Sequence, residues 1–111
     1  MITLEEKAGE IGLDIATTEK LLEKFIEVTR EDIRMLKDAE EEDDWVRVRE
    51  IAHHIKGAAV NLNLTEIAEA GEQLESLDEI SLRRGAAEVI RNMERSFLQH
   101  RNLVDEKNAR D

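Results

Sequence analysis

Three residues of the chain have types and spacing that could do chemistry together. His53, Lys56 and Gly57 are separated by three and four positions, which makes them neighbours on one face of a helix. A neutral imidazole is a nucleophile near pH 7, because its ordinary pKa is about 6.5. The ammonium of Lys56 could offset the negative charge of a phosphoryl group. The pattern would suit a histidine that accepts such a group.

Gly57 is the most informative of the three residues. A glycine inside a helix costs about 1 kcal/mol relative to alanine. The missing side chain, one turn after His53, clears space in which a partner or a phosphoryl group could approach the imidazole. The alternative is that His53 is an ordinary surface residue of a charged helix. The residues alone leave both interpretations open.

Helical rotation separates the two adjacent histidines. With Ile55 at the centre of the buried face, a rotation of about 100° per residue turns His53 about 160° away from it. His54 lies on the flank, nearer the seam with a neighbouring helix. The buried face is completed by Val48, Ile51, Ala52, Ala58, Ala59 and Leu62. The residues that could dock a partner protein around His53 are Val46, Arg49, Glu50 and Val60.

The composition predicts an all-α protein. The 111 residues include no proline and five glycines, and only 3% of them are aromatic. Long helices need little glycine or proline, whereas strands are usually richer in aromatic and β-branched residues. The length fits a single domain that spans residues 1–111.

The charge of the chain excludes several classes of function. The formal net charge is -11, whereas a nucleic-acid binder needs a concentrated basic surface. No apolar run is long enough to span a bilayer, and the first residues do not resemble a secretory signal. Cysteine is absent, so thiol chemistry is excluded. We expect a cytoplasmic protein without membrane insertion, and with no metal or cofactor of its own.

Capping residues divide the chain into five predicted helices. These run from Thr3 to Gly12, from Asp14 or Thr17 to about Glu40, from Asp43 or Asp44 to about Leu62, from Asn63 to about Leu77, and from Asp78 or Ser81 into a tail that frays after about Val104. The apolar stripe of the second helix is Leu21, Leu22, Phe25, Val28, Ile33, Leu36 and Ala39. The acidic run at residues 40–44 is expected to be a solvated turn. Short connections between long amphipathic helices favour antiparallel neighbours. We therefore predict an antiparallel up-and-down four-helix bundle with a short extra N-terminal helix.

The run Ala52-His53-His54-Ile55-Lys56-Gly57-Ala58 resembles the signature of the histidine-containing phosphotransfer (HPt) domains. Further similarity lies at Gly12-Leu13-Asp14, Phe25, Asp44-Trp45 and the segment from Leu64 to Glu75. The resemblance implies that His53 takes a phosphoryl group from a receiver-domain aspartate and passes it to another receiver. Lys56 would be its charge partner and Gly57 the clearance residue. The implied partners are response-regulator receiver domains, which would bring magnesium, and sensor or hybrid histidine kinases. The chain would be a carrier and not an autonomous kinase.

Two positions depart from the family pattern. Asn63 stands where the family usually has glycine, and asparagine is the next best residue for a left-handed helix end. Glu75 stands where some members have a glutamine that bonds the histidine ring. A glutamate could accept a hydrogen bond from a ring N–H, but it adds negative charge near a phosphoryl group. Gln73 is the other candidate for this role.

Three alternatives remain at this stage. A helical adaptor could keep the fold without being phosphorylated, and the domain could be one module of a larger kinase. Glu50 and His53 also have the Glu-x-x-His spacing of di-iron bundles. Such sites need this motif on two helices, however, and only one is present, with its histidine turned outward.

Overall fold

Five helices make up almost all of the chain in the computed structural model, which describes residues 2–110, with side chains up to residue 105. They are α1 (Leu4–Ile11), α2 (Ile15–Glu41), α3 (Trp45–Asn61), α4 (Thr65–Ser76) and α5 (Glu79–Arg110). No strand occurs between residues 2 and 110, so the predicted all-α class is confirmed. The last helix, α5, extends as far as Arg110. The expected fraying after about Val104 stays a prediction.

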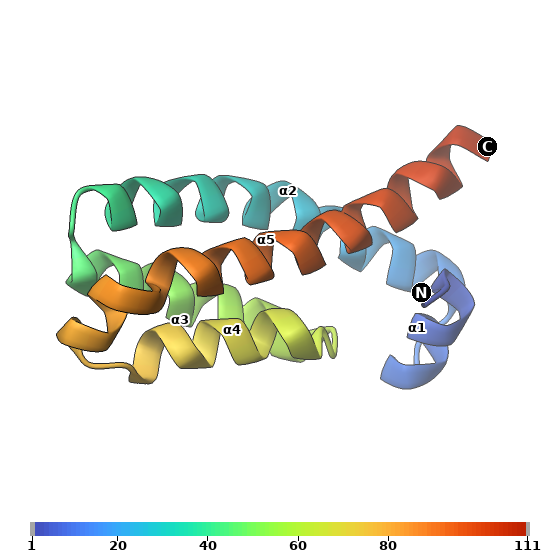
Figure 1. Cartoon of the computed structure of the whole chain (residues 1–111). Helices are drawn as coiled ribbons and strands as arrows, with labels where there is room; N and C mark the ends of the chain where they lie inside the picture. The colour runs from blue at the N-terminus through green and yellow to red at the C-terminus, as the bar shows by residue number, and fades with distance from the viewer. Residues whose placement is uncertain (1, 111) are drawn as a thin grey trace.

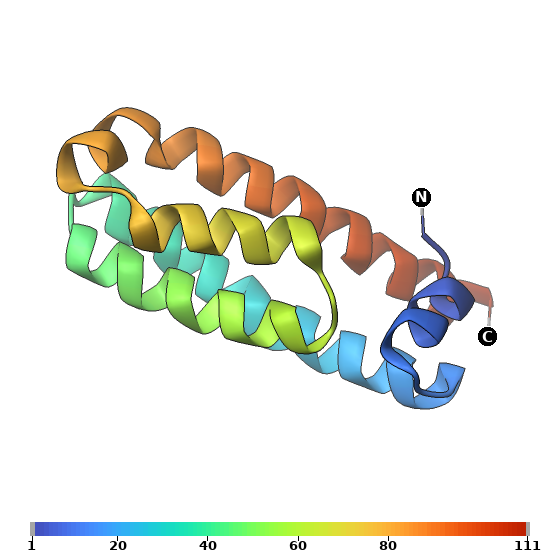
Figure 2. The same cartoon turned by 90° about the horizontal axis from the view of Figure 1, so that it is seen from below.

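The four long helices form an antiparallel bundle (Figures 1 and 2). Each packs against two others, so that α3 lies between α2 and α4, and α5 lies between α4 and α2. The short α1 lies across one end of the bundle, beside the start of α2. This is the architecture that the amphipathic pattern predicted.

Most of the predicted caps are confirmed. The side chains of Thr3, Asp14, Asp44 and Asp78 each accept a hydrogen bond from a backbone N–H three residues later, at 3.1, 2.7, 3.2 and 2.8 Å. Gly12 ends α1 with a left-handed φ of 72°. The prediction that Asn63 caps α4 is wrong. α4 begins after Leu64 without a side-chain cap. Asn63 adopts a left-handed φ of 54°, which confirms the expectation that asparagine can replace glycine at this helix end.

The buried stripe of α2 differs from the prediction at two positions. Leu22, Phe25, Ile33, Leu36 and Ala39 are buried as expected, but Leu21 and Val28 are 40% and 37% exposed. Both lie at the edge that α2 shares with α3, where the small Ala58 leaves space. A groove of about 320 Å³ remains between the two helices there, lined by Leu21, Phe25, Val28, His54, Ala58 and others.

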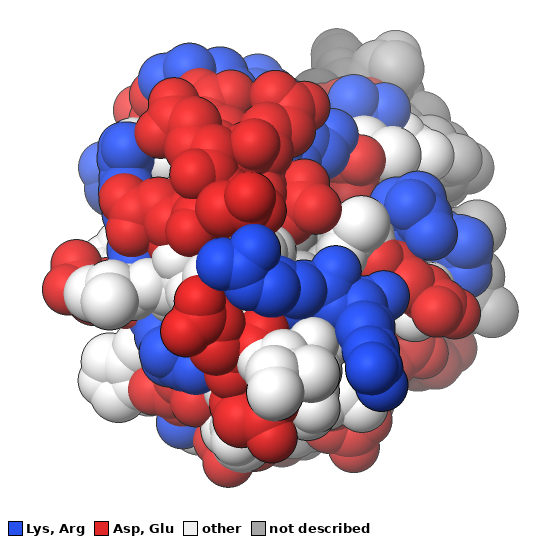
Figure 3. Space-filling model, turned by 60° about the vertical axis from the view of Figure 1, so that its left-hand side comes forward, with Lys and Arg blue, Asp and Glu red and all other residues white. Residues whose placement is uncertain are grey.

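The predicted solvated turn at residues 40–44 is confirmed only for residues 42–44, because Glu40 and Glu41 still belong to α2 and Glu40 is half-buried. Residues 41–44 are exposed, and Asp43 has a left-handed φ of 56°. Figure 3 shows acidic side chains gathered over this end of the molecule, with lysine and arginine side chains beside them. The strongest concentration of negative charge in that view therefore lies near the turn.

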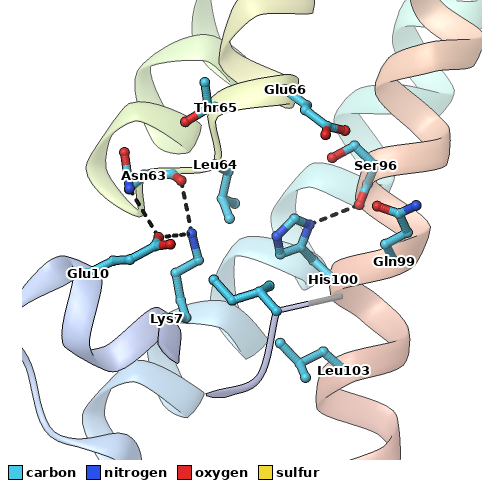
Figure 4. Close-up of a pocket in the computed structure, with 11 residues that line it drawn as sticks. Lys7, Glu10, Asn63, Leu64, Thr65, Glu66, Ser96, Gln99, His100 and Leu103 are labelled. Atoms are coloured by element: carbon cyan, nitrogen blue, oxygen red, sulfur yellow. Dashed lines mark hydrogen bonds and ion pairs between the residues drawn. The ribbon is translucent and has the colours of Figure 1, made fainter. Parts of the chain in front are cut away.

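A buried lysine joins α1 to the rest of the bundle (Figure 4). Lys7 is only 3% exposed, and its Nζ donates to Glu10 Oε2 at 2.8 Å and to the Asn63 carbonyl at 2.9 Å. The Asn63 amide also donates to Glu10 Oε2 at 3.1 Å. These contacts border a cavity of about 490 Å³ that His100 of α5 also lines. The turn between α3 and α4 thus holds α1 in place.

Candidate functional site

His53 lies on the outward face of α3, as helical rotation predicted. Its side chain is 71% exposed, whereas Ile55, two residues later, is completely buried in the core. The buried face of α3 is anchored between α2 and α4. The helix therefore presents the imidazole from a rigid element, and a macromolecule can reach it.

Glu75 of α4 contacts the His53 ring. Its Oε1 lies against Nδ1 of the imidazole. An ionised carboxylate can only accept at that contact, so Nδ1 carries a proton; in the neutral imidazole the lone pair is then on Nε2. Of the two residues considered as ring partners, the structure brings Glu75 to the ring, and Gln73 is exposed on α4.

Lys56 lies between two carboxylates of α4. Its Nζ is 2.5 Å from Glu75 Oε2 and 2.9 Å from Glu72 Oε2. Hydrogen bonds to Glu75 and then Glu72 raise the pKa of Lys56. The same lysine is the main cause that lowers the pKa of each of the two glutamates. The ammonium and both carboxylates are therefore charged at neutral pH, and His53, Glu75, Lys56 and Glu72 form one connected cluster.

A glycine of α4 allows this cluster to form. A Cβ at Gly71 would lie 3.0 Å from the Ala52 carbonyl oxygen and 3.0 Å from the Lys56 Cβ. Only glycine therefore fits without movement where α4 crosses α3. The close approach brings Glu72 and Glu75 within reach of Lys56. Gly71 and Glu72 were not singled out from the sequence, although an interior glycine on the buried face of α4 was a visible signal.

Gly57 has the opposite surroundings. A Cβ there would meet no atom within 4 Å, and the residue is exposed. The packing of this chain therefore does not require glycine at position 57. The space that a side chain would fill lies open, one turn along the helix from His53.

His54 also has a carboxylate partner, which sequence reasoning missed. Its Nδ1 lies 2.7 Å from Oδ2 of Asp32 on α2, and its side chain is 63% exposed. Asp32 occupies a position on the apolar stripe of α2, and a carboxylate at such a position was the available signal. Exposure and ring orientation thus do not distinguish the two histidines. The difference is that the carboxylate beside His53 also binds a lysine, whereas the described ion pair of Asp32 is with His54.

The predicted docking residues divide into free and engaged side chains. Val46 and Val60 are 65% and 61% exposed, and each lies two helical turns from His53 on the same face. Glu50 is exposed as well. Arg49 is engaged, because its Nη2 donates to the Leu77 carbonyl at 3.0 Å. One exposed valine therefore lies two helical turns from His53 on each side.

Neither a metal cluster nor a membrane helix is found in the part of the chain that the structure describes. No group of three or more His, Cys, Asp or Glu side chains within that part is arranged to hold a metal ion. None of its helices combines the length and the apolar character needed to cross a bilayer.

The fold and the site define a class of protein: a helical bundle that presents an oriented imidazole, with an ammonium close by, to a macromolecular partner. The family model of the Hpt domain matches residues 20–106. The chain belongs to this family of histidine phosphotransfer domains, which are phosphoryl carriers in phosphorelay signalling and not autonomous kinases. The family implies receiver domains and histidine kinases as partners. Comparisons with curated proteins and with solved structures found no match.

Proposed function

We propose that His53 carries the phosphoryl group of this domain and that Lys56 stabilises it. The observation that supports this choice most strongly is the contact of His53 with a carboxylate that also binds Lys56. His54 has an imidazole of similar exposure, but the ion pair of its carboxylate involves no lysine or arginine.

Transfer would begin with attack of His53 Nε2 on the phosphorus of an aspartyl phosphate in a receiver domain. The N–P bond forms as the O–P bond breaks, and the aspartate leaves as a carboxylate. Attack by the aspartate of a second receiver reverses these changes and releases the imidazole. Because in-line transfer depends mainly on positioning and charge stabilisation, this chain needs to supply only an oriented nucleophile and a positive charge. We expect the magnesium ion on the receiver.

Glu75 would orient the ring. Its hydrogen bond holds the proton on Nδ1, which keeps the Nε2 lone pair available for attack. Nitrogen-15 NMR distinguishes the two tautomers of a neutral imidazole. It should show the Nδ1–H form of His53 in the wild type and a mixture in Glu75→Ala. An unchanged tautomer in Glu75→Ala would refute this role.

The surface around His53 would dock the receiver. Val46 and Val60 provide apolar contact on either side of the histidine, and Gly57 leaves room beside it. Glu50 could add a polar contact at the rim, while Arg49 would act mainly through its bond to the loop before α5. We propose that the domain functions in the cytoplasm, where the receiver domains and kinases implied by the family would meet it.

The test compares His53→Gln with His54→Gln. Glutamine keeps polarity and similar size but has no nucleophilic ring nitrogen. Phosphoryl acceptance is measured with a phosphorylated receiver domain and, independently of any partner, with phosphoramidate as donor. We expect His53→Gln to abolish acid-labile phosphate uptake and His54→Gln to retain it, with melting curves confirming that both fold. Uptake by folded His53→Gln, with loss in His54→Gln, would assign the reaction to the other histidine.

A further inference from the structure

A phosphoryl group on His53 would add negative charge beside the ion pair of Lys56 and Glu72. Phosphorylation adds a charge of about −1.5 to −2 at pH 7. If His53 carries the phosphoryl group, as proposed above, the group forms close to two carboxylates that already bind Lys56. Two of the three N–H donors of the ammonium already bind these carboxylates, and its single positive charge would be shared with the phosphoryl oxygens, so the groups compete for it.

Glu72 is held in position to compete. Its Oε2 accepts from Lys56 Nζ at 2.9 Å, while the Ser76 hydroxyl donates to its Oε1 at 3.0 Å. The single hydrogen of this hydroxyl is shared between Oε1 and the Glu72 carbonyl oxygen, which lies 2.6 Å from Ser76 Oγ. The carboxylate is therefore oriented from within α4 and is ionised at neutral pH, because Lys56 and then Ser76 lower its pKa.

Glu72 and Glu75 have separable roles. Glu75 contacts both the ring of His53 and the ammonium of Lys56, so its removal disturbs the nucleophile and the charge partner together. Among the residues whose side chains the structure describes, Glu72 forms hydrogen bonds with Lys56 and Ser76 only. Glu72 can therefore influence the phosphoryl group through Lys56 without changing the orientation of the ring.

We propose that Glu72 sets the equilibrium of phosphoryl transfer by competing with the phosphoryl group for Lys56. In the unphosphorylated domain, the Glu72 carboxylate stabilises the ammonium. In the phosphorylated domain, it withholds part of that positive charge from the phosphoryl oxygens. Both effects disfavour phosphohistidine relative to aspartyl phosphate, so Glu72 drives the group onward to a receiver. Glu72 is a positioning residue for Lys56, and the inference rests on the proposed role of His53.

The test measures the transfer equilibrium in Glu72→Gln and in a matched control. Glu69→Gln makes the same change of charge one turn earlier on α4, at an exposed residue outside the described ion pairs of Lys56. Wild type and variants are mixed with a phosphorylated receiver domain until the ratio of phosphohistidine to aspartyl phosphate is constant. Because the Lys56–Glu72 pair is solvent-accessible, we expect Glu72→Gln to raise this ratio about two- to fivefold. Glu69→Gln should change it by less, and the effect of Glu72→Gln should disappear in a Lys56→Ala background.

A spectroscopic measurement tests the same competition without a partner. Phosphohistidine is prepared with phosphoramidate, and the pKa of its phosphoryl oxygens is followed by phosphorus-31 NMR. Glu72→Gln should lower this pKa, because the freed ammonium favours the dianion, and the shift should require Lys56. If wild type is phosphorylated on His53 but Glu72→Gln matches Glu69→Gln in both measurements, the inference is overturned while the function stands. If His53 is not phosphorylated in the wild type, the proposed function of His53 and the inference about Glu72 both fail.

Discussion

At the scale of single residues, the site is a chain of charges around Lys56 more than an isolated histidine. Glu75 contacts both the imidazole and the ammonium, and Glu72 contacts the ammonium alone. His53, Lys56 and Gly57 were found from the sequence because their spacing lies within one helix. Glu72 and Asp32 were missed, because their partners are 16 and 22 residues away. Such contacts depend on how two helices are aligned, which periodicity within one helix does not specify.

The charge cluster makes folding stability depend on pH in a defined direction. The pKa values of Glu72 and Glu75 are lowered in the folded chain, first of all by Lys56. The unfolded chain therefore binds more protons in acid, so their contribution is present above about pH 4.3, the ordinary glutamate pKa. It is lost as the pH falls through the lowered values of the folded state.

Lys56→Met should reduce this dependence. Without the ammonium, the pKa values of both glutamates move back toward their ordinary range. The free energy of unfolding should then fall less steeply between about pH 5 and pH 3 than in the wild type. Urea unfolding across that range measures the slope, and Lys20→Met is the matched control, since Lys20 is exposed on α2. A slope in Lys56→Met equal to that of the control would contradict the electrostatic account.

At the scale of the helices, two glycines on facing elements have opposite purposes. Gly57 of α3 faces open space, whereas Gly71 of α4 is pressed against Ala52 and Lys56 of α3. The sequence showed both as helix-interior glycines, and a single helix does not reveal which one faces a neighbour. The caps were easier to predict, because a side chain that bonds a backbone N–H three residues later is a local feature. Asn63 was the exception, since it ends one helix and does not begin the next.

Gly57→Ala should stabilise the domain. The added methyl group meets no atom within 4 Å, so the helix gains up to about 1 kcal/mol of intrinsic propensity. The larger Gly57→Leu side chain should instead fill the space beside His53 and slow phosphoryl transfer by about tenfold or more, because the reacting atoms can no longer align. Melting curves and transfer rates check the two expectations separately. Wild-type transfer by Gly57→Leu would show that the open space is irrelevant.

Gly71→Ala should have the opposite effect on stability. Its Cβ would lie 3.0 Å from a backbone oxygen and 3.0 Å from a Cβ, and neither atom is the mobile end of a side chain. The helices must separate, at a cost of about 1–3 kcal/mol that outweighs the propensity gain of up to about 1 kcal/mol. Chemical denaturation gives the free energy of unfolding of Gly71→Ala and of Gly57→Ala, two variants that carry the same substitution in different surroundings. Equal stabilisation by both substitutions would mean that α3 and α4 do not pack as closely as described.

At the scale of the molecule, α1 contributes no residue to the proposed site around His53, whose described contacts come from α3 and α4. The match to the Hpt family begins at residue 20, so α1 lies outside it. This helix is held by the turn at Asn63, whose carbonyl accepts from Lys7 and whose amide donates to Glu10. The asparagine at this position therefore both tolerates the left-handed backbone and binds α1. The amphipathic pattern predicted the four-helix bundle and the short extra helix, but it did not reveal a buried lysine as the link between them.

Lys7→Met should destabilise the fold without affecting the chemistry of His53. Methionine fills a similar volume but removes the hydrogen bond to the Asn63 carbonyl, which costs about 0.5–1.5 kcal/mol because Asn63 is exposed and water can replace the donor. The loss also frees Glu10, whose pKa is lowered chiefly by its hydrogen bond to Lys7 and should rise toward its ordinary value. Lys20→Met removes the same charge from an exposed position and should leave stability nearly unchanged. Phosphoryl transfer by folded Lys7→Met should equal that of the wild type, because Lys7 contacts Glu10 and the Asn63 turn and not the cluster around Lys56. If the Lys7→Met variant is fully folded but transfers phosphate more slowly, the α1 end of the bundle and the proposed site around His53 are coupled.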